Sequence, residues 1–284
     1  MRKAKKILML VPALTLILSL TACAGGQKSA REALETAMEH SGQESSMSAR
    51  VVMEAEMKLS LGGEEQTARM LTSVEASMIY EPLKMKMNMS VEIEGQSAMD
   101  AELYAQEQDG ACMLYLNDGA GWYSSSVDVS DLEGYTGLAD LELLWGLSGE
   151  LAEAGSEELD GTDTYRYTGA FSGEEALQII GDSGALDSAA SLGLDPEEFL
   201  DQLTREVSDI PVTVWIGKDA CRVVRYEMDM SGAMNDLVRE MLAAALGSQA
   251  EDVAMEFPAM RAGVDCWDYG AVEDFDIPAE ALAA

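Results

Sequence analysis

Methionine is the side chain whose type and spacing most directly suggest a binding function in this sequence. Of its 19 methionines, 17 lie beyond residue 22, and many occupy every second position of long alternating runs. Alternate side chains of a β-strand point to one face, and methionines adapt to irregular apolar molecules because the thioether chain is flexible and polarizable. The pattern predicts a ligand cavity lined by Met53, Met57, Met70, Met78, Met85, Met87, Met89, Tyr226, Met228 and Met230. An ordinary core using methionine in place of leucine fits equally well, and only a cavity of roughly 300 Å3 or more would separate the two.

Other chemistries find less support in the residues. Met85, Met87 and Met89 could offer thioethers to Cu(I), but alternate residues of one strand are roughly 7 Å apart, too far to share an ion. The segment 181–184, Gly-Asp-Ser-Gly, resembles a protease nucleophile segment, yet the only histidine, His40, has no matching motif. Weak Ca2+ binding is not favoured because the loop aspartates lack EF-hand spacing. These are Asp128, Asp131, Asp160 and Asp163. We therefore expect no enzymatic activity, no metal site and no cofactor.

The N-terminal sequence predicts that the protein is located outside the cytoplasm. Four basic residues within positions 2–6 precede 14 mostly apolar residues, Ile7 to Leu20, which is short for a membrane-spanning helix but suits a signal peptide. The segment 20–23, Leu-Thr-Ala-Cys, resembles the lipobox of secreted bacterial lipoproteins. By that resemblance residues 1–22 are removed, and Cys23 carries fatty-acyl chains such as palmitate at the start of a short tether, 23–27. The protein would then be anchored to the outer face of the cell membrane through its lipid.

The net charge of the chain limits the kinds of molecule that it can bind. The chain has 18 Lys and Arg against 52 Asp and Glu, a formal net charge of -34. So negative a surface repels phosphate backbones, which excludes nucleic-acid binding. Removal of the signal peptide leaves 14 cations and a net charge of −38. There are three further cysteines, Cys112, Cys221 and Cys266, and none of them is part of a CxxC motif. They allow at most one disulfide among themselves, and the sequence leaves open which of them pair.

Hydrophobic periodicity predicts strands at both ends of the chain and helices between them. Period-two alternation and turn residues place strands at 47–61, 68–80, 83–93, 99–105, 112–116, 122–125, 164–171, 212–216, 222–230, 253–257 and 262–268. Helical spacing and capping signals place helices at 28–40, 138–154, from 172 onward, 195–207 and 234–246. The long early strands with tight turns predict an antiparallel meander with one apolar face. A weak break near residue 130 is the one candidate boundary.

This order of elements resembles the LolA-like lipoprotein carriers, in particular their LppX/LprG-type branch in Gram-positive bacteria. The resemblance rests on the segments 209–218 and 223–230, similar to the family's V-x-V-W-I-D strand and its hairpin partner, and on 274–280, similar to its terminal segment. Gly217 stands where the family usually has an acidic turn residue, and the helix 234–246 resembles an insertion. The resemblance implies an α+β fold, with a strongly curved antiparallel sheet forming an unclosed half-barrel and helices packed on its concave side.

The sequence thus predicts one LolA-like domain over 28–284, present as a monomer. We expect a membrane-anchored extracytoplasmic lipoprotein that binds or carries a lipid or lipidated molecule. The alternative is a structural or sensory cell-surface lipoprotein whose core is filled by its own side chains.

Overall fold

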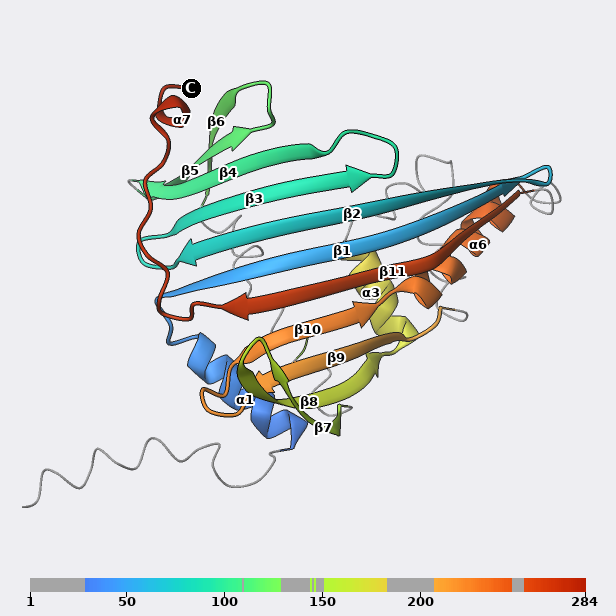
Figure 1. Cartoon of the computed structure of the whole chain (residues 1–284), viewed down its shortest axis with the longest axis horizontal. Coiled ribbons are helices and arrows are strands. Elements are labelled where there is room, and N and C mark those ends of the chain that lie inside the picture. Colours follow the sequence, from blue (N-terminus) through green and yellow to red (C-terminus); the bar gives the residue numbers. More distant parts are fainter. Residues whose placement is uncertain are drawn as a thin grey trace, which may run out of the picture.

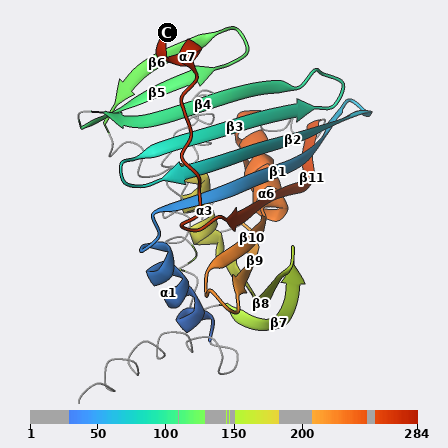
Figure 2. The ribbon, with the colours of Figure 1, turned by 60° about the vertical axis from the view of Figure 1, so that its left-hand side comes forward.

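A computed structural model describes residues 29–108, 110–128, 144, 146, 151–182, 207–246 and 253–284. Within these residues, the centre of the molecule is one sheet of eleven strands (Figure 1). The strand order is β6-β5-β4-β3-β2-β1-β11-β10-β9-β8-β7, and all neighbouring strands are antiparallel. The strands are β1 (Ser46–Leu61), β2 (Glu64–Ile79), β3 (Lys84–Ile93), β4 (Met99–Gln108), β5 (Ala111–Asn117), β6 (Trp122–Val127), β7 (Ala152–Leu159), β8 (Thr162–Phe171), β9 (Ile210–Gly217), β10 (Val223–Asp229) and β11 (Val253–Trp267). Because β6 and β7 end this order without pairing to each other, the sheet stays open, and Figure 2 shows its strong curvature. The predicted open antiparallel sheet is confirmed.

The register gives the sheet two chemically different faces. Residues directly opposite each other across paired strands point to the same side. One row of such partners is Ala101, Met89, Val74, Val51, Val264, Tyr226, Val214 and Tyr167. The adjacent row is Glu102, Asn88, Glu75, Arg50, Asp265, Arg225, Trp215 and Arg166. We call the side of the first row the apolar face and the side of the second the polar face.

The described helices are α1 (Ala30–Ser41), α3 (Gly173–Asp182), α6 (Ser231–Leu246) and α7 (Ala279–Leu282). The longer helices α1, α3 and α6 lie on the apolar side, whereas the short α7 lies on the polar side. In Figure 1, α1 and α3 lie behind the sheet. Ser29 and Glu32 form a reciprocal capping box at the start of α1, and Ser172 with Glu175 does the same before α3. The start of α3 was predicted, whereas α1 begins two residues later than predicted and α6 three residues earlier than its apolar periodicity indicates.

The C-terminal tail covers part of the polar face. It runs across the sheet in Figures 1 and 2, and Ile277 and Ala281 bury themselves against Tyr104 of β4 and Tyr115 of β5. Lys84 holds Asp274 at 2.5 Å. The tail thereby shields aromatic side chains that the strand alternation places on the polar side.

One predicted helix, 138–154, is wrong at its end. Residues 152–154 belong to β7, a strand that the sequence pattern does not predict. β7 pairs with β8, and this pairing overrides the helical preference of the Leu- and Ala-containing segment. Leu144, Gly146 and Leu151 are the other residues of that predicted helix that the structure describes. The predicted helix 195–207 lies outside the described residues except for Val207.

The two closing strands, 253–257 and 262–268, are also corrected, because they form the single strand β11. The sequence suggests a break at Pro258, which cannot donate to the ladder. Instead the register shifts there, opposite Glu56 and Lys58, as a bulge. At this bulge the Asn235 side chain takes the place of a strand partner for Phe257. The Asn235 Nδ2 donates to the Phe257 carbonyl at 3.0 Å, and the Phe257 N–H donates to the Asn235 Oδ1 at 2.6 Å. This pair also fastens α6 to β11.

Candidate ligand-binding face

The structure places the ten predicted cavity residues on one side of the sheet. Met53 and Met57 lie on β1, and seven more lie on the apolar face of β2, β3 and β10, with Met230 directly after β10. They form two groups. Met78 lies opposite both Met47 and Met85, whereas Tyr226, Met228 and Met230 belong to a separate cluster around β8, β9 and β10. The predicted set is therefore spread along the face and does not converge on one point.

The apolar face of β8–β10 is filled by the protein itself, and we call it the covered half. Tyr167, Val214 and Leu34 are 0%, 0% and 1% exposed, and side chains of α1, α3 and α6 complete the same cluster. Burial raises the pKa of the Tyr167 hydroxyl to about 12. Tyr226 is buried here, while Met228 and Met230 pack against the cluster from its margin.

The apolar face of β2–β6 is progressively uncovered, and we call it the methionine half. Along β3, Met85 is 4% exposed, Met87 is half-buried and Met89 is 38% exposed. Met89 lies opposite Ala101 on β4, and Val91, two residues further along β3, lies opposite Met99. Two neighbouring positions on β5 and β6, Leu116 and Tyr123, face each other and are also exposed, as is Met99. A contiguous apolar strip thus faces outward from the sheet.

Sequence reasoning missed Met99, Leu116 and Tyr123 as members of this strip. Their alternation was recognised, but not their common face. A signal was present, since Leu103 pairs with Leu116 and Leu116 with Tyr123 once the hairpin turns set the register. Tyr123 carries the apolar strip to the edge strand β6.

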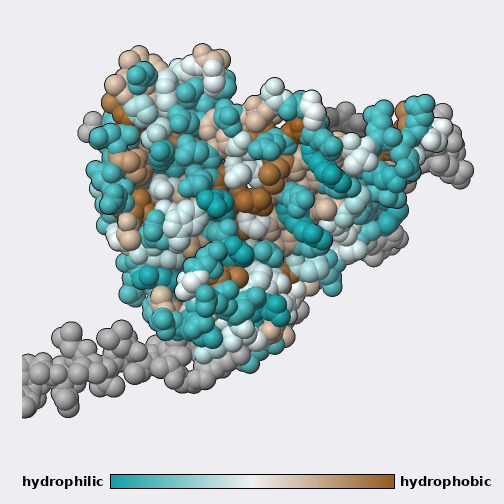
Figure 3. All heavy atoms as spheres, in the orientation of Figure 1, coloured by the Kyte–Doolittle hydropathy of each residue, from teal (hydrophilic) through white to brown (hydrophobic). Residues whose placement is uncertain are grey.

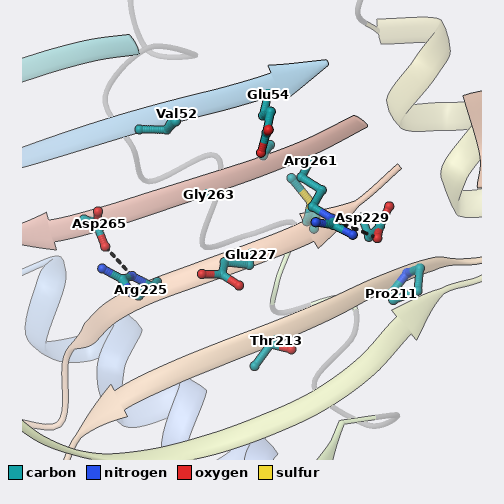
Figure 4. A pocket seen from close by; sticks show the side chains of 12 residues that line it. Val52, Glu54, Pro211, Thr213, Arg225, Glu227, Asp229, Arg261, Gly263 and Asp265 are labelled. Carbon is teal, nitrogen blue, oxygen red and sulfur yellow. Dashed lines mark hydrogen bonds and ion pairs between the residues drawn. The ribbon is translucent and has the colours of Figure 1, made fainter. Parts of the chain in front are cut away.

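A separate hollow of about 420 Å3 lies on the polar face, where Gly263 has no side chain (Figure 4). Arg225 and Asp265 pair on one side of it at 2.5 Å, and Arg261 and Asp229 pair on the other at 3.2 Å. Burial alone would raise the pKa of the Asp229 carboxyl, but hydrogen bonds from Ser231 and Arg261 hold that pKa below its ordinary value. Figure 3 shows many hydrophilic residues on this side of the molecule, with hydrophobic residues between them. Four of the hollow's charges form these two pairs, and the carboxylates of Glu54 and Glu227 also line it.

A third hollow, of about 690 Å3, lies between α6 and the end of β11. Leu242, Val253, Met255 and Pro258 give it a mainly apolar lining. It was not predicted, because it depends on the seating of α6 against the β11 bulge.

The predicted lipidation residue Cys23 and the signal peptide lie outside the described residues. Cys112 and Cys266 form no disulfide, and burial raises the pKa of the Cys112 thiol. Within the described ranges, the His, Cys, Asp and Glu side chains form no group of three that could hold a metal ion. Nor does any described helix have the length and apolar character needed to cross a bilayer.

Residues 29–125 match a family described as "Family of unknown function (DUF6612)". No curated protein matches the chain. Among solved structures, LprF from Mycobacterium bovis has a TM-score of 0.47 at 16% identity, with 89% of this chain and 97% of that chain covered. The lipoprotein LppX from Mycobacterium tuberculosis has a TM-score of 0.43 at 14% identity, with 88% and 100% covered. A LolA superfamily protein from Nitrosomonas europaea has a TM-score of 0.20 at 13% identity, with 88% and 96% covered. Proteins of the kinds named in the resemblance are thus among the solved structures to which the chain is similar.

Proposed function

We propose that this protein is a non-enzymatic lipoprotein, held at the outer face of the cell membrane by acylated Cys23, that binds or carries an apolar ligand on its methionine half. The observation that carries the proposal is the exposed strip of Met89, Met99, Leu116 and Tyr123 on the apolar face. Covering such a strip with acyl chains removes apolar surface from water, which is worth about 0.8 kcal/mol for each buried CH2 group.

The methionines support a ligand of variable shape. Met87 and Met89 can change side-chain conformation at little cost, so the strip can fit acyl chains that differ in branching or length. Anchoring would keep the strip beside a membrane, the source of such molecules.

The experiment is a titration with Nile red, using protein that carries Cys23→Ser so that no acyl chain of its own competes. We expect saturable binding, and we expect Met89→Glu to weaken it about tenfold or more, since a carboxylate in the strip must be desolvated by the dye. The matched control is Leu71→Glu. Leu71 is 40% exposed, close to the 38% of Met89, but it lies on the polar face.

The alternative is a structural or sensory surface lipoprotein, and the filled cluster of the covered half favours it. That function predicts no saturable binding by the wild-type chain. Equal losses for the Met89 and Leu71 variants would also reject the proposed site.

Anchoring is tested separately in cells. Cys23→Ser should move the protein from the membrane fraction to the soluble extracytoplasmic fraction, while Cys112→Ser leaves it in the membrane fraction. Membrane retention of the Cys23 variant would reject the lipid anchor.

A further inference from the structure

Positive charge is segregated to one face of the sheet. All eight Lys and Arg residues in the described strands lie on the polar face. They are Arg50, Lys58, Arg69, Lys84, Lys86, Arg166, Arg225 and Arg261. Since alternation gives a strand residue even odds of either side, this distribution is a property of the whole sheet.

Acidic partners hold seven of these eight cations on the polar face, and Lys86 lies over the ring of Tyr104 on the same face. Arg69 lies 2.8 Å from Glu56, and Arg50 lies 3.3 Å from Glu75 on the next strand. Arg261 is likewise paired with Asp229, and Arg225 with Asp265. Because these guanidinium groups point to the polar side and are paired with carboxylates there, they cannot contact a ligand bound on the apolar face.

The strand charges that reach the apolar face are negative, whereas one loop cation, Lys218, lies over the ring of Tyr165 on the covered half. Glu107 faces Cys112 on β5, and Glu153 faces Tyr167 on β8. Glu64 lies opposite Leu61 at the end of the β1–β2 hairpin. Outside the strands, the stretches 129–150 and 247–252 contain no Lys or Arg, and 183–206 contains only Arg205. The remaining cations beyond residue 22 are Lys28, Arg31, Lys218, Arg222 and Arg239.

A negatively charged head group would meet a poor environment on this face. Burying an ionised group without a partner is costly, and nearby carboxylates add repulsion. An uncharged head group avoids both costs, and an ammonium is attracted to the acidic rim.

We infer that the ligand of the methionine half is a long-chain amphiphile whose head group carries no negative charge. This inference rests on the proposed function, because it concerns the same strip. It adds selection among apolar ligands by head-group charge, achieved by keeping every strand cation on the opposite side of the sheet.

The test compares three probes with the same chain, dodecanol, dodecylamine and dodecanoate, by displacement of Nile red from the Cys23→Ser protein at pH 7.5. We expect dodecanoate to bind about tenfold more weakly than dodecanol, or worse, which corresponds to about 1.4 kcal/mol or more. High salt should reduce any general attraction of dodecylamine to the acidic surface and leave the preference for dodecanol over dodecanoate in place.

A charge-gain pair completes the experiment. Met89→Lys places a cation in the strip and should strengthen dodecanoate binding several-fold, while Leu71→Lys makes the same change in net charge on the polar face and should not. Equal affinity for dodecanol and dodecanoate, or equal gains from both lysine variants, would overturn the charge selection and leave the proposed function standing. Failure of Nile red and all three probes to bind would instead reject the proposed function itself.

Discussion

The covered half and the methionine half share one sheet and one alternating pattern, yet they use different side chains. The fully buried strand residues of the covered half are β-branched or aromatic. They include Val212, Val214, Ile216, Val223 and Phe171. The buried cluster of the methionine half contains Met78 and Met85 instead, together with Met47 on the adjoining strand β1. β-Branched chains have few rotamers, whereas methionine has many. The protein thus has stiff side chains where its own helices complete the packing and adaptable ones where its apolar face is left open.

The largest effect should come from enlarging a cavity in the covered half. Phe171 is 2% exposed at the end of β8, so Phe171→Ala should lower the free energy of unfolding by about 3–5 kcal/mol. Met89→Ala, in the exposed strip, should lower it by less than about 1 kcal/mol. Urea denaturation followed by circular dichroism measures both. Similar losses for the two variants would show that the halves do not differ in packing.

An intermediate effect is expected where α6 is fastened to the sheet. Asn235→Ala leaves the N–H and carbonyl of Phe257 without their partner at the β11 bulge, which should cost about 1–3 kcal/mol. Asn88→Ala, at an exposed position of β3, is the control and should change stability by less than about 0.5 kcal/mol. If the Asn235 variant unfolds like the wild type, the side chain does not support the bulge.

The smallest effect should be a pH dependence localised to α6. Burial alone would raise the pKa of the Asp236 carboxyl, but hydrogen bonds from Ser208 and Arg239 hold that pKa below its ordinary value of 3.8. A carboxyl whose pKa is lower in the folded state stabilises the protein above the unfolded pKa and ceases to do so as the pH falls through the folded pKa. Asp236→Asn should therefore reduce stability at pH 7 and flatten its decline below about pH 4. Urea denaturation at pH 7, 5 and 3 measures this, and an unchanged slope in the variant would contradict it.

Much of the fold could be predicted because strand alternation is a local property. The four early runs became β1–β4, and the hairpin around Lys218 became β9 and β10. The errors arose where distant partners decide the structure. Pro258 indicates a strand end, but Asn235, more than 20 residues away, satisfies the bulge. The segment 152–154 favours a helix, but pairing with β8 makes it a strand.

The candidate site divides in the same way. Which methionines share a face could be predicted, because the period of two follows from strand geometry alone. The separation of Tyr226 and Met228 from Met85 and Met89 could not be predicted, because it depends on strands β11, β1 and β2 lying between them in the sheet.

The sequence by itself determined the alternation, the acidic surface and the placing of strand cations opposite the methionines, since these depend only on residue type and on the two-residue period of a strand. Only the tertiary structure decided that helices fill the face at β8–β10 while Met89 and Met99 stay exposed. The physical reason is that exposure depends on which elements pack over a side chain, and those elements come from distant parts of the chain.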